Sequence, residues 1–264
     1  MINTLTIESG KINFIRTGPR SGNTVVLLHP MGMDLTLWGD QILALKTKFD
    51  VIALDLPGHG FSGRLEGEHS FENLATVIVS FIENISVEAF HLVGISYGGM
   101  IAQEVAIRNP DLVLSLTLIA TACTFPDSVR QILRDRAEFT RNKGIVALAP
   151  LSLARWFTPE FSAERPDVID RITKLLYLQD AFDHATIWDT VASLDSESRL
   201  GELSLPALII VGDKDASTPI ASAEVMAKAL KSNNIQIVKN AAHFPMLEKP
   251  ELVNNLLLTF FDSL

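Results

Sequence analysis

The sequence predicts an α/β fold in which a mostly parallel, eight-stranded sheet is flanked by helices and carries a helical insertion after the sixth strand. Short runs rich in β-branched residues alternate with longer helical patterns, as in strands joined by crossover helices. The strand pattern disappears between residues 124 and 200, where helical segments remain. A chain of 264 residues is long enough for one such domain with an insertion.

Eight runs have the composition and length of strands. The first two are so close in the chain that only a hairpin can connect them, whereas the later ones leave room for crossover connections. The predicted strands cover residues 4–8, 11–17, 25–29, 50–54, 90–95, 114–120, 207–212 and 235–238.

Helical patterns lie between and beyond these strands. The dipeptides Asn109-Pro110 and Lys249-Pro250 mark places where a proline stops or starts a helix. The predicted helices cover residues 71–85, 97–108, 221–230 and 251–264.

The insertion at residues 124–200 is predicted to form a helical cap on a core made of residues 1–123 and 201–264. It contains several arginines together with Trp156 and Trp188. The alternative interpretation is that these helices simply complete the globule without covering a site.

Composition and charge restrict the class of partner. The net charge of −9 argues against nucleic acid, because phosphate binding needs a basic face. A single cysteine, Cys123, cannot form an internal disulfide, and the first residues lack the basic start and the apolar stretch of roughly 7–15 residues that secretion needs. The longest apolar run, near residues 112–123, is well short of the ~20 residues that span a bilayer. We therefore expect a cytoplasmic protein with no membrane partner.

A serine between glycines follows the fifth predicted strand, in the sequence Gly-Ile-Ser-Tyr-Gly at residues 94–98. A strand before and a helix after this segment force Ser96 onto a sharp turn, which the flanking glycines permit. The turn also places Ser96 at a helix N-terminus, where free N–H groups stabilise negative charge. The alternative is an ordinary glycine-flanked turn capped by a serine.

A serine nucleophile needs a histidine to accept its proton and a carboxylate to orient that histidine. His243 follows the last predicted strand, and Asp215 follows the seventh. Both therefore belong to the sheet edge where open α/β sheets bind ligands. Asp213 is the alternative carboxylate, and each of these residues could instead be a turn or loop residue without a catalytic role.

The chain resembles the α/β-hydrolase-fold enzymes over essentially its whole length. The motifs that carry the resemblance are His-Pro-Met-Gly at residues 29–32, Asp-Leu-Pro-Gly-His-Gly-Phe-Ser at 55–62, the Ser96 turn, Gly-Asp-Lys-Asp at 212–215, and His243 followed by Glu248. The resemblance implies that Ser96 is the nucleophile, His243 the general base and Asp215 the orienting acid. It also implies an oxyanion hole formed by the N–H groups of Met31 and Tyr97. Many relatives have glycine at the position of Pro30, which has no N–H to donate.

A serine at this position favours acyl transfer to water through an acyl-enzyme, whereas relatives that open epoxides or remove halide use aspartate. Runs at residues 31–38, 155–159 and 241–243 are similar to 3-oxoadipate enol-lactonases, whose substrate is a small lactone with a free carboxylate. Such a substrate needs a nearby cation, and Arg155 is predicted to bind it with Trp156 as a wall of the pocket. Arg155 could equally pair with carboxylates of the cap, and Trp156 could be a core residue.

The predicted function is hydrolysis of a small-molecule ester or lactone, with enol-lactone hydrolysis as its sharper form. Two alternatives remain: a carbon–carbon bond hydrolase of aromatic catabolism, and a signalling receptor that keeps the triad but acts by binding a ligand. No cofactor and no metal are predicted, because the histidines lack ligand spacing and no phosphate-binding glycine loop is present. The sequence leaves the oligomeric state open.

Overall fold

A single eight-stranded sheet organises the structure, with the strands in the order β1-β2-β4-β3-β5-β6-β7-β8. The computed structural model describes residues 2–8, 10–20 and 23–264. Strands β1, β2 and β4 pair antiparallel, and every pair from β4–β3 onward is parallel. The strands are β1 (Ile2–Ile7), β2 (Gly10–Thr17), β3 (Thr24–Leu28), β4 (Asp50–Leu54), β5 (Phe90–Ile95), β6 (Val113–Ile119), β7 (Ala207–Gly212) and β8 (Ile235–Val238). The predicted mostly parallel sheet of eight strands is confirmed.

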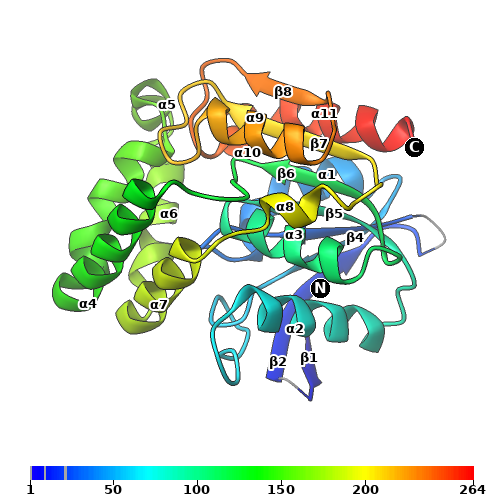
Figure 1. Cartoon of the computed structure of the whole chain (residues 1–264), viewed down its shortest axis with the longest axis horizontal. Helices are drawn as coiled ribbons and strands as arrows, with labels where there is room; N and C mark the ends of the chain where they lie inside the picture. Colours follow the sequence, from blue (N-terminus) through cyan, green and yellow to red (C-terminus); the bar gives the residue numbers. More distant parts are fainter. Residues whose placement is uncertain (1, 9, 21–22) are drawn as a thin grey trace.

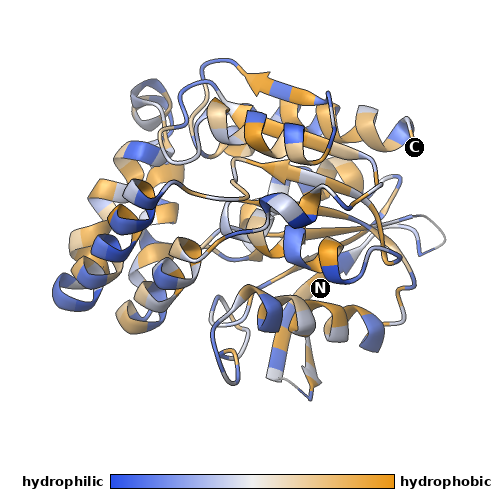
Figure 2. Ribbon diagram, viewed as in Figure 1, coloured by the Kyte–Doolittle hydropathy of each residue, from blue (hydrophilic) through white to orange (hydrophobic). Residues whose placement is uncertain are grey.

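Helices cover both faces of this sheet (Figure 1). They are α1 (Gly39–Leu45), α2 (Phe71–Asn84), α3 (Tyr97–Arg108), α9 (Ile220–Ala229), α10 (Pro245–Glu248) and α11 (Pro250–Asp262), with a 3-10 turn η1 (Leu35–Trp38). Because side chains alternate along a strand, each central strand contributes to two cores. Val25 and Leu27 of β3 join the core under α1 and α11, whereas Val26 and Leu28 join the core under α2, α3 and α9. Figure 2 shows the resulting apolar centre.

The predicted helical insertion is confirmed between β6 and β7. It contains α4 (Asp127–Trp156), α5 (Pro159–Glu164), α6 (Pro166–Tyr177), α7 (Ala181–Ala192) and α8 (Glu197–Leu200). Helices α4 to α7 gather at one end of the molecule, beside the sheet (Figure 1). Helix α4 is interrupted at Gly144, which has a φ of 77° and so redirects the second half of the helix. The division into a core and a cap at residues 124 and 200 stays a prediction.

The segment Leu35–Leu45 contains two elements that the sequence pattern did not predict, η1 and α1. Gly39 is the C-cap of η1 and the first residue of α1, and a glycine at this point weakens the helical pattern of the segment. In the part of the chain that the structure describes, no helix is both long and apolar enough to cross a membrane.

Candidate active site

Ser96 lies on a sharp turn between β5 and α3. Its backbone has φ 51° and ψ −119°, a conformation that a non-glycine residue rarely adopts. The turn depends on its glycines, because a Cβ on Gly94 would lie 2.4 Å from the Gly98 carbonyl oxygen and one on Gly98 would lie 2.3 Å from the Leu28 carbonyl oxygen. The Ser96 N–H donates to the Ile119 carbonyl at 2.9 Å and fixes the turn against β6.

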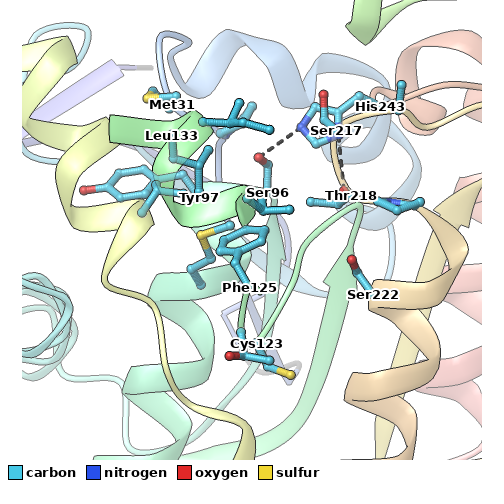
Figure 3. Close-up of a pocket in the computed structure, with 18 of the residues that line it drawn as sticks. Met31, Ser96, Tyr97, Cys123, Phe125, Leu133, Ser217, Thr218, Ser222 and His243 are labelled. Carbon is cyan, nitrogen blue, oxygen red and sulfur yellow. Dashed lines mark hydrogen bonds between the residues drawn. The ribbon is translucent and has the colours of Figure 1, made fainter. Parts of the chain in front are cut away.

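The three side chains predicted to converge do form one hydrogen-bonded chain. His243 Nε2 lies 3.0 Å from Ser96 Oγ, and His243 Nδ1 lies 2.9 Å from Asp215 Oδ2. The Ser96–His243 bond is visible in Figure 3. Ser96, Asp215 and His243 follow β5, β7 and β8, so the carboxyl ends of three parallel strands bring them together. The histidine and the aspartate are buried, whereas Ser96 lines a cavity.

Asp215 is held as a carboxylate by several donors. Its Oδ1 accepts the N–H groups of Ser217 at 2.8 Å and Thr218 at 3.0 Å, and its Oδ2 accepts the Thr218 hydroxyl at 2.8 Å. Burial alone would raise the pKa of Asp215, but the His243 imidazole and the Thr218 donors lower it below its ordinary value. Asp213, the alternative carboxylate, instead accepts the Asn240 N–H at 2.8 Å. Asp215, and not Asp213, is therefore the aspartate hydrogen-bonded to His243.

The loop that carries His243 is tied to the helical insertion. The His243 N–H donates to the carbonyl of Trp156 at 3.1 Å, and the two rings stack with centroids 6.5 Å apart. Buried Glu248 accepts the Ala242 N–H at 2.8 Å on one oxygen and the Thr158 hydroxyl at 2.6 Å on the other. Desolvation raises the pKa of Glu248. Glu248 belongs to the motif that follows His243 in the sequence, but its role in holding this loop was not predicted.

The two N–H groups predicted to form an oxyanion hole belong to Met31 and Tyr97, which line the same cavity as Ser96. Neither N–H has a hydrogen-bond acceptor among the described residues. The Tyr97 N–H is free because it is the first residue of α3, and its side chain points away from Ser96 in Figure 3.

A buried histidine that the sequence analysis did not single out holds the loop of Met31. His59 Nε2 accepts the Gly32 N–H at 3.0 Å. His59 Nδ1 lies 3.1 Å from the Pro57 carbonyl oxygen, so this nitrogen carries the proton and leaves Nε2 as an acceptor. Burial, with the nearby His29, lowers the pKa of His59 to about 3 and keeps the ring neutral.

A cavity of about 710 Å³ opens at Ser96 between the sheet and the insertion. Its wall is mostly apolar, and α4 contributes one helical face to it. Side chains that line it include Phe125, Val129, Leu133, Trp156, Trp188 and Val225.

Of the two predicted substrate-binding residues, only Trp156 lies on the cavity wall. Arg155, the preceding residue of α4, is partly buried and does not line the cavity. The arginine on the wall is Arg136, which the sequence analysis missed. Its helical spacing from Val129 and Leu133 puts the three on one face, but the sequence alone does not say which face turns toward Ser96.

No group of three or more His, Cys, Asp or Glu side chains within residues 2–8, 10–20 and 23–264 is arranged to hold a metal ion.

The sequence of residues 23–250 matches the family described as "alpha/beta hydrolase fold", and the chain belongs to this family. It is 25% identical to 3-oxoadipate enol-lactonase 2 of Acinetobacter baylyi over 252 residues, covering 96% of this chain and 93% of that one. Among solved structures, the enol-lactonase of Burkholderia xenovorans LB400 has a TM-score of 0.91 at 24% identity, covering 98% of this chain and 100% of that one. A thermophilic esterase from Thermogutta terrifontis, solved with malate bound, has a TM-score of 0.90 at 26% identity, covering 100% of this chain and 98% of that one.

Proposed function

We propose that this chain is a serine hydrolase that cleaves a carboxylic ester or lactone through an acyl-enzyme. The observation that carries the proposal is the continuous chain from Ser96 Oγ to His243 Nε2 at 3.0 Å and from His243 Nδ1 to Asp215 Oδ2 at 2.9 Å. This geometry supplies a proton acceptor to a hydroxyl that is otherwise a poor nucleophile at neutral pH.

In the proposed mechanism, Ser96 Oγ attacks the substrate carbonyl carbon while His243 Nε2 takes its proton. Asp215 accepts a hydrogen bond from the N–H at His243 Nδ1, which keeps the ring in the required tautomer and stabilises the imidazolium. The negative charge that develops on the carbonyl oxygen is stabilised by the N–H groups of Met31 and Tyr97. These donors have no other acceptor among the described residues, so both are free to bind the oxyanion.

His243 then returns its proton to the leaving oxygen, and the carbon–oxygen bond breaks. With a lactone, that oxygen stays attached to the acyl group, so the acyl-enzyme retains the whole substrate. A water molecule, deprotonated by His243, attacks the acyl carbon, and the proton passes back to Ser96 as the carboxylic acid leaves.

Within this class of substrates, a carboxylated enol-lactone is the more specific candidate. It is supported by the similarity to enol-lactonases at about 25% identity over nearly the whole chain. The esterase relative keeps simple esters in the range of substrates to be tested.

The proposal is tested by a panel of short-chain aryl esters, neutral lactones and carboxylated lactones, assayed with the wild-type protein and with Ser96→Ala. We expect sustained turnover of at least one ester or lactone and a loss of about 10⁴-fold or more in kcat for the variant. Thermal unfolding of both proteins is the control for folding. A single slow turnover with retained product would instead favour a ligand-binding receptor, and equal rates in both proteins would overturn the role of Ser96.

A further inference from the structure

Arg136 is a charged side chain on the cavity wall that the proposed hydrolysis step does not use. It lies on the face of α4 that also contributes Val129 and Leu133 to the cavity. Its guanidinium carbon lies 5.3 Å from the centroid of the Trp188 ring, which also lines the cavity, so the aromatic face supports the cation. Leu133, one turn before Arg136 on α4, lines the same cavity as Ser96 (Figure 3).

The positive charge of Arg136 is not balanced within the described part of the chain. No carboxylate forms an ion pair with it, and no described residue accepts a hydrogen bond from it. Arg155 lies near enough to add like charge, and it too lacks a carboxylate partner among these residues. The Trp188 indole N–H is buried and also has no acceptor there.

Burial, together with the charge of Arg155, lowers the pKa of Arg136 to about 10, which still leaves the side chain cationic at neutral pH. Two neighbouring cations that are partly removed from water destabilise the folded protein unless an anion joins them. The sequence has 31 acidic residues, yet none within residues 2–8, 10–20 and 23–264 forms an ion pair with either arginine. The imbalance therefore points to an anion that comes from outside the chain.

The other charged residue on the wall, Glu197, is near Cys123 rather than Arg136. Burial raises the pKa of the Cys123 thiol, and the negative charge of Glu197 raises it further. Figure 3 places Cys123 and Leu133 on different sides of Ser96. An anionic substrate group is consequently disfavoured on the Cys123 side and favoured on the side of α4 and α7.

We propose that Arg136, supported by Trp188, binds a carboxylate on the substrate and so selects anionic esters or lactones. This inference depends on the proposed hydrolase function. A guanidinium matches a carboxylate with two parallel hydrogen bonds, which gives both strength and orientation. The apolar side chains Val129 and Leu133 beside it suit a short hydrocarbon segment between that carboxylate and the reactive carbonyl.

The test compares two esters of equal chain length, 4-nitrophenyl hydrogen adipate and 4-nitrophenyl hexanoate, which differ in the terminal carboxylate. Arg136→Gln removes the charge and keeps a polar side chain of similar shape. Arg155→Gln is the matched control, because it removes an adjacent charge that does not line the cavity.

For Arg136→Gln we expect kcat/KM for the anionic ester to fall about 10- to 100-fold, the usual effect of losing a hydrogen bond to a charged group. The neutral ester should change less than about threefold, and Arg155→Gln should change the ratio between the two esters only a few-fold. An equal fall for both esters, or a greater loss of selectivity with Arg155→Gln, would overturn the proposal.

Binding of adipate, measured by calorimetry, separates this inference from the hydrolase proposal. The wild-type protein should bind adipate at least about tenfold more tightly than Arg136→Gln, whether or not either ester is hydrolysed. Equal affinities would refute the anion site. Absence of turnover combined with this difference in affinity would refute hydrolysis alone.

Discussion

Ser96 has a backbone conformation that a serine adopts only at a free-energy cost. Its φ of 51° with ψ of −119° is a region that glycine enters without strain. Such strain at a single residue is about 1–3 kcal/mol and persists where the surrounding structure fixes the conformation. Here the Ile119 carbonyl accepts the Ser96 N–H, and the Thr121 hydroxyl donates to the Ser96 carbonyl at 2.7 Å. The fold thus stores strain at the residue whose hydroxyl must project into the cavity.

Replacing Ser96 by glycine should therefore stabilise the protein while removing its activity. We expect the free energy of unfolding to rise by about 1 kcal/mol, because relief of strain exceeds the extra backbone entropy of glycine. Urea unfolding measures this change, and the ester assay measures the loss of turnover. Ser96→Ala is the control, since it removes the hydroxyl but keeps the Cβ and hence the strain. A glycine variant no more stable than the alanine variant would contradict this account.

The three residues of the hydrogen-bonded chain were predictable from the sequence, because a serine nucleophile needs a histidine and a carboxylate beside it. A serine between glycines, a histidine and an aspartate each follow a strand, and parallel strands bring their carboxyl ends to one edge. Arg136 was not predictable, because helical spacing defines a face of α4 but not its direction. Arg155 was the cation predicted to bind a substrate carboxylate, in the run 155–159 that is similar to the enol-lactonases, but it does not line the cavity.

At the scale of elements, Glu248 joins α10 to the loop of His243 and to the start of α5. Its two oxygens accept three hydrogen bonds, from the Ala242 N–H, the Thr158 N–H and the Thr158 hydroxyl. The insertion and the histidine loop are therefore fixed to one another through one buried carboxylate. Helix α4 adds a second link, since its last residue, Trp156, accepts the His243 N–H.

We expect Glu248→Gln to lower both stability and kcat. A glutamine places an NH₂ group against N–H donors, leaving at least one buried group unpaired at a cost of about 1–3 kcal/mol. Loss of the Ala242 bond should also loosen the His243 loop and reduce kcat more than it changes KM. Glu88→Gln, at an exposed position, is the control and should alter stability by less than about 0.5 kcal/mol. If both variants behave alike in unfolding and turnover, Glu248 does not position the loop.

Most elements of the sheet were predictable because buried parallel strands are short apolar runs separated by helices. The predicted strand ends differ most at β1, predicted at residues 4–8 and observed at Ile2–Ile7, whereas β3 and β6 are each shifted by one residue. The arrangement of the insertion was not predictable. Its helices pack through contacts between residues distant in sequence, and the break at Gly144 depends on a backbone angle that periodicity does not reveal.

For the whole molecule, neutral buried histidines link folding to pH. Three of them, His29, His59 and His184, are almost fully buried, and desolvation lowers their pKa values to about 4, 3 and 3. In the unfolded chain the same groups titrate near their ordinary value of 6.5. At pH values between the folded and the unfolded pKa, the unfolded state binds protons that the folded state does not. The free energy of unfolding therefore decreases as the pH falls through this range. Together they contribute up to about 4 kcal/mol per pH unit, at ~1.4 kcal/mol for each group.

His184 allows this linkage to be tested, because both of its ring nitrogens are buried without a hydrogen-bond partner in the described residues, and replacement by leucine loses no bond there. The folded protein keeps His184 neutral. Its contribution to the free energy of unfolding is therefore fully present above pH 6.5 and is lost as the pH falls toward about 3. We expect the stability difference between His184→Leu and the wild type to shift by about 2 kcal/mol in favour of the variant between pH 7.5 and pH 5. Urea unfolding at both pH values measures it, and the difference at pH 7.5 alone accounts for any change in packing against Trp188. A wild type and variant with parallel pH dependence would mean that His184 titrates in the folded protein as it does in the unfolded chain.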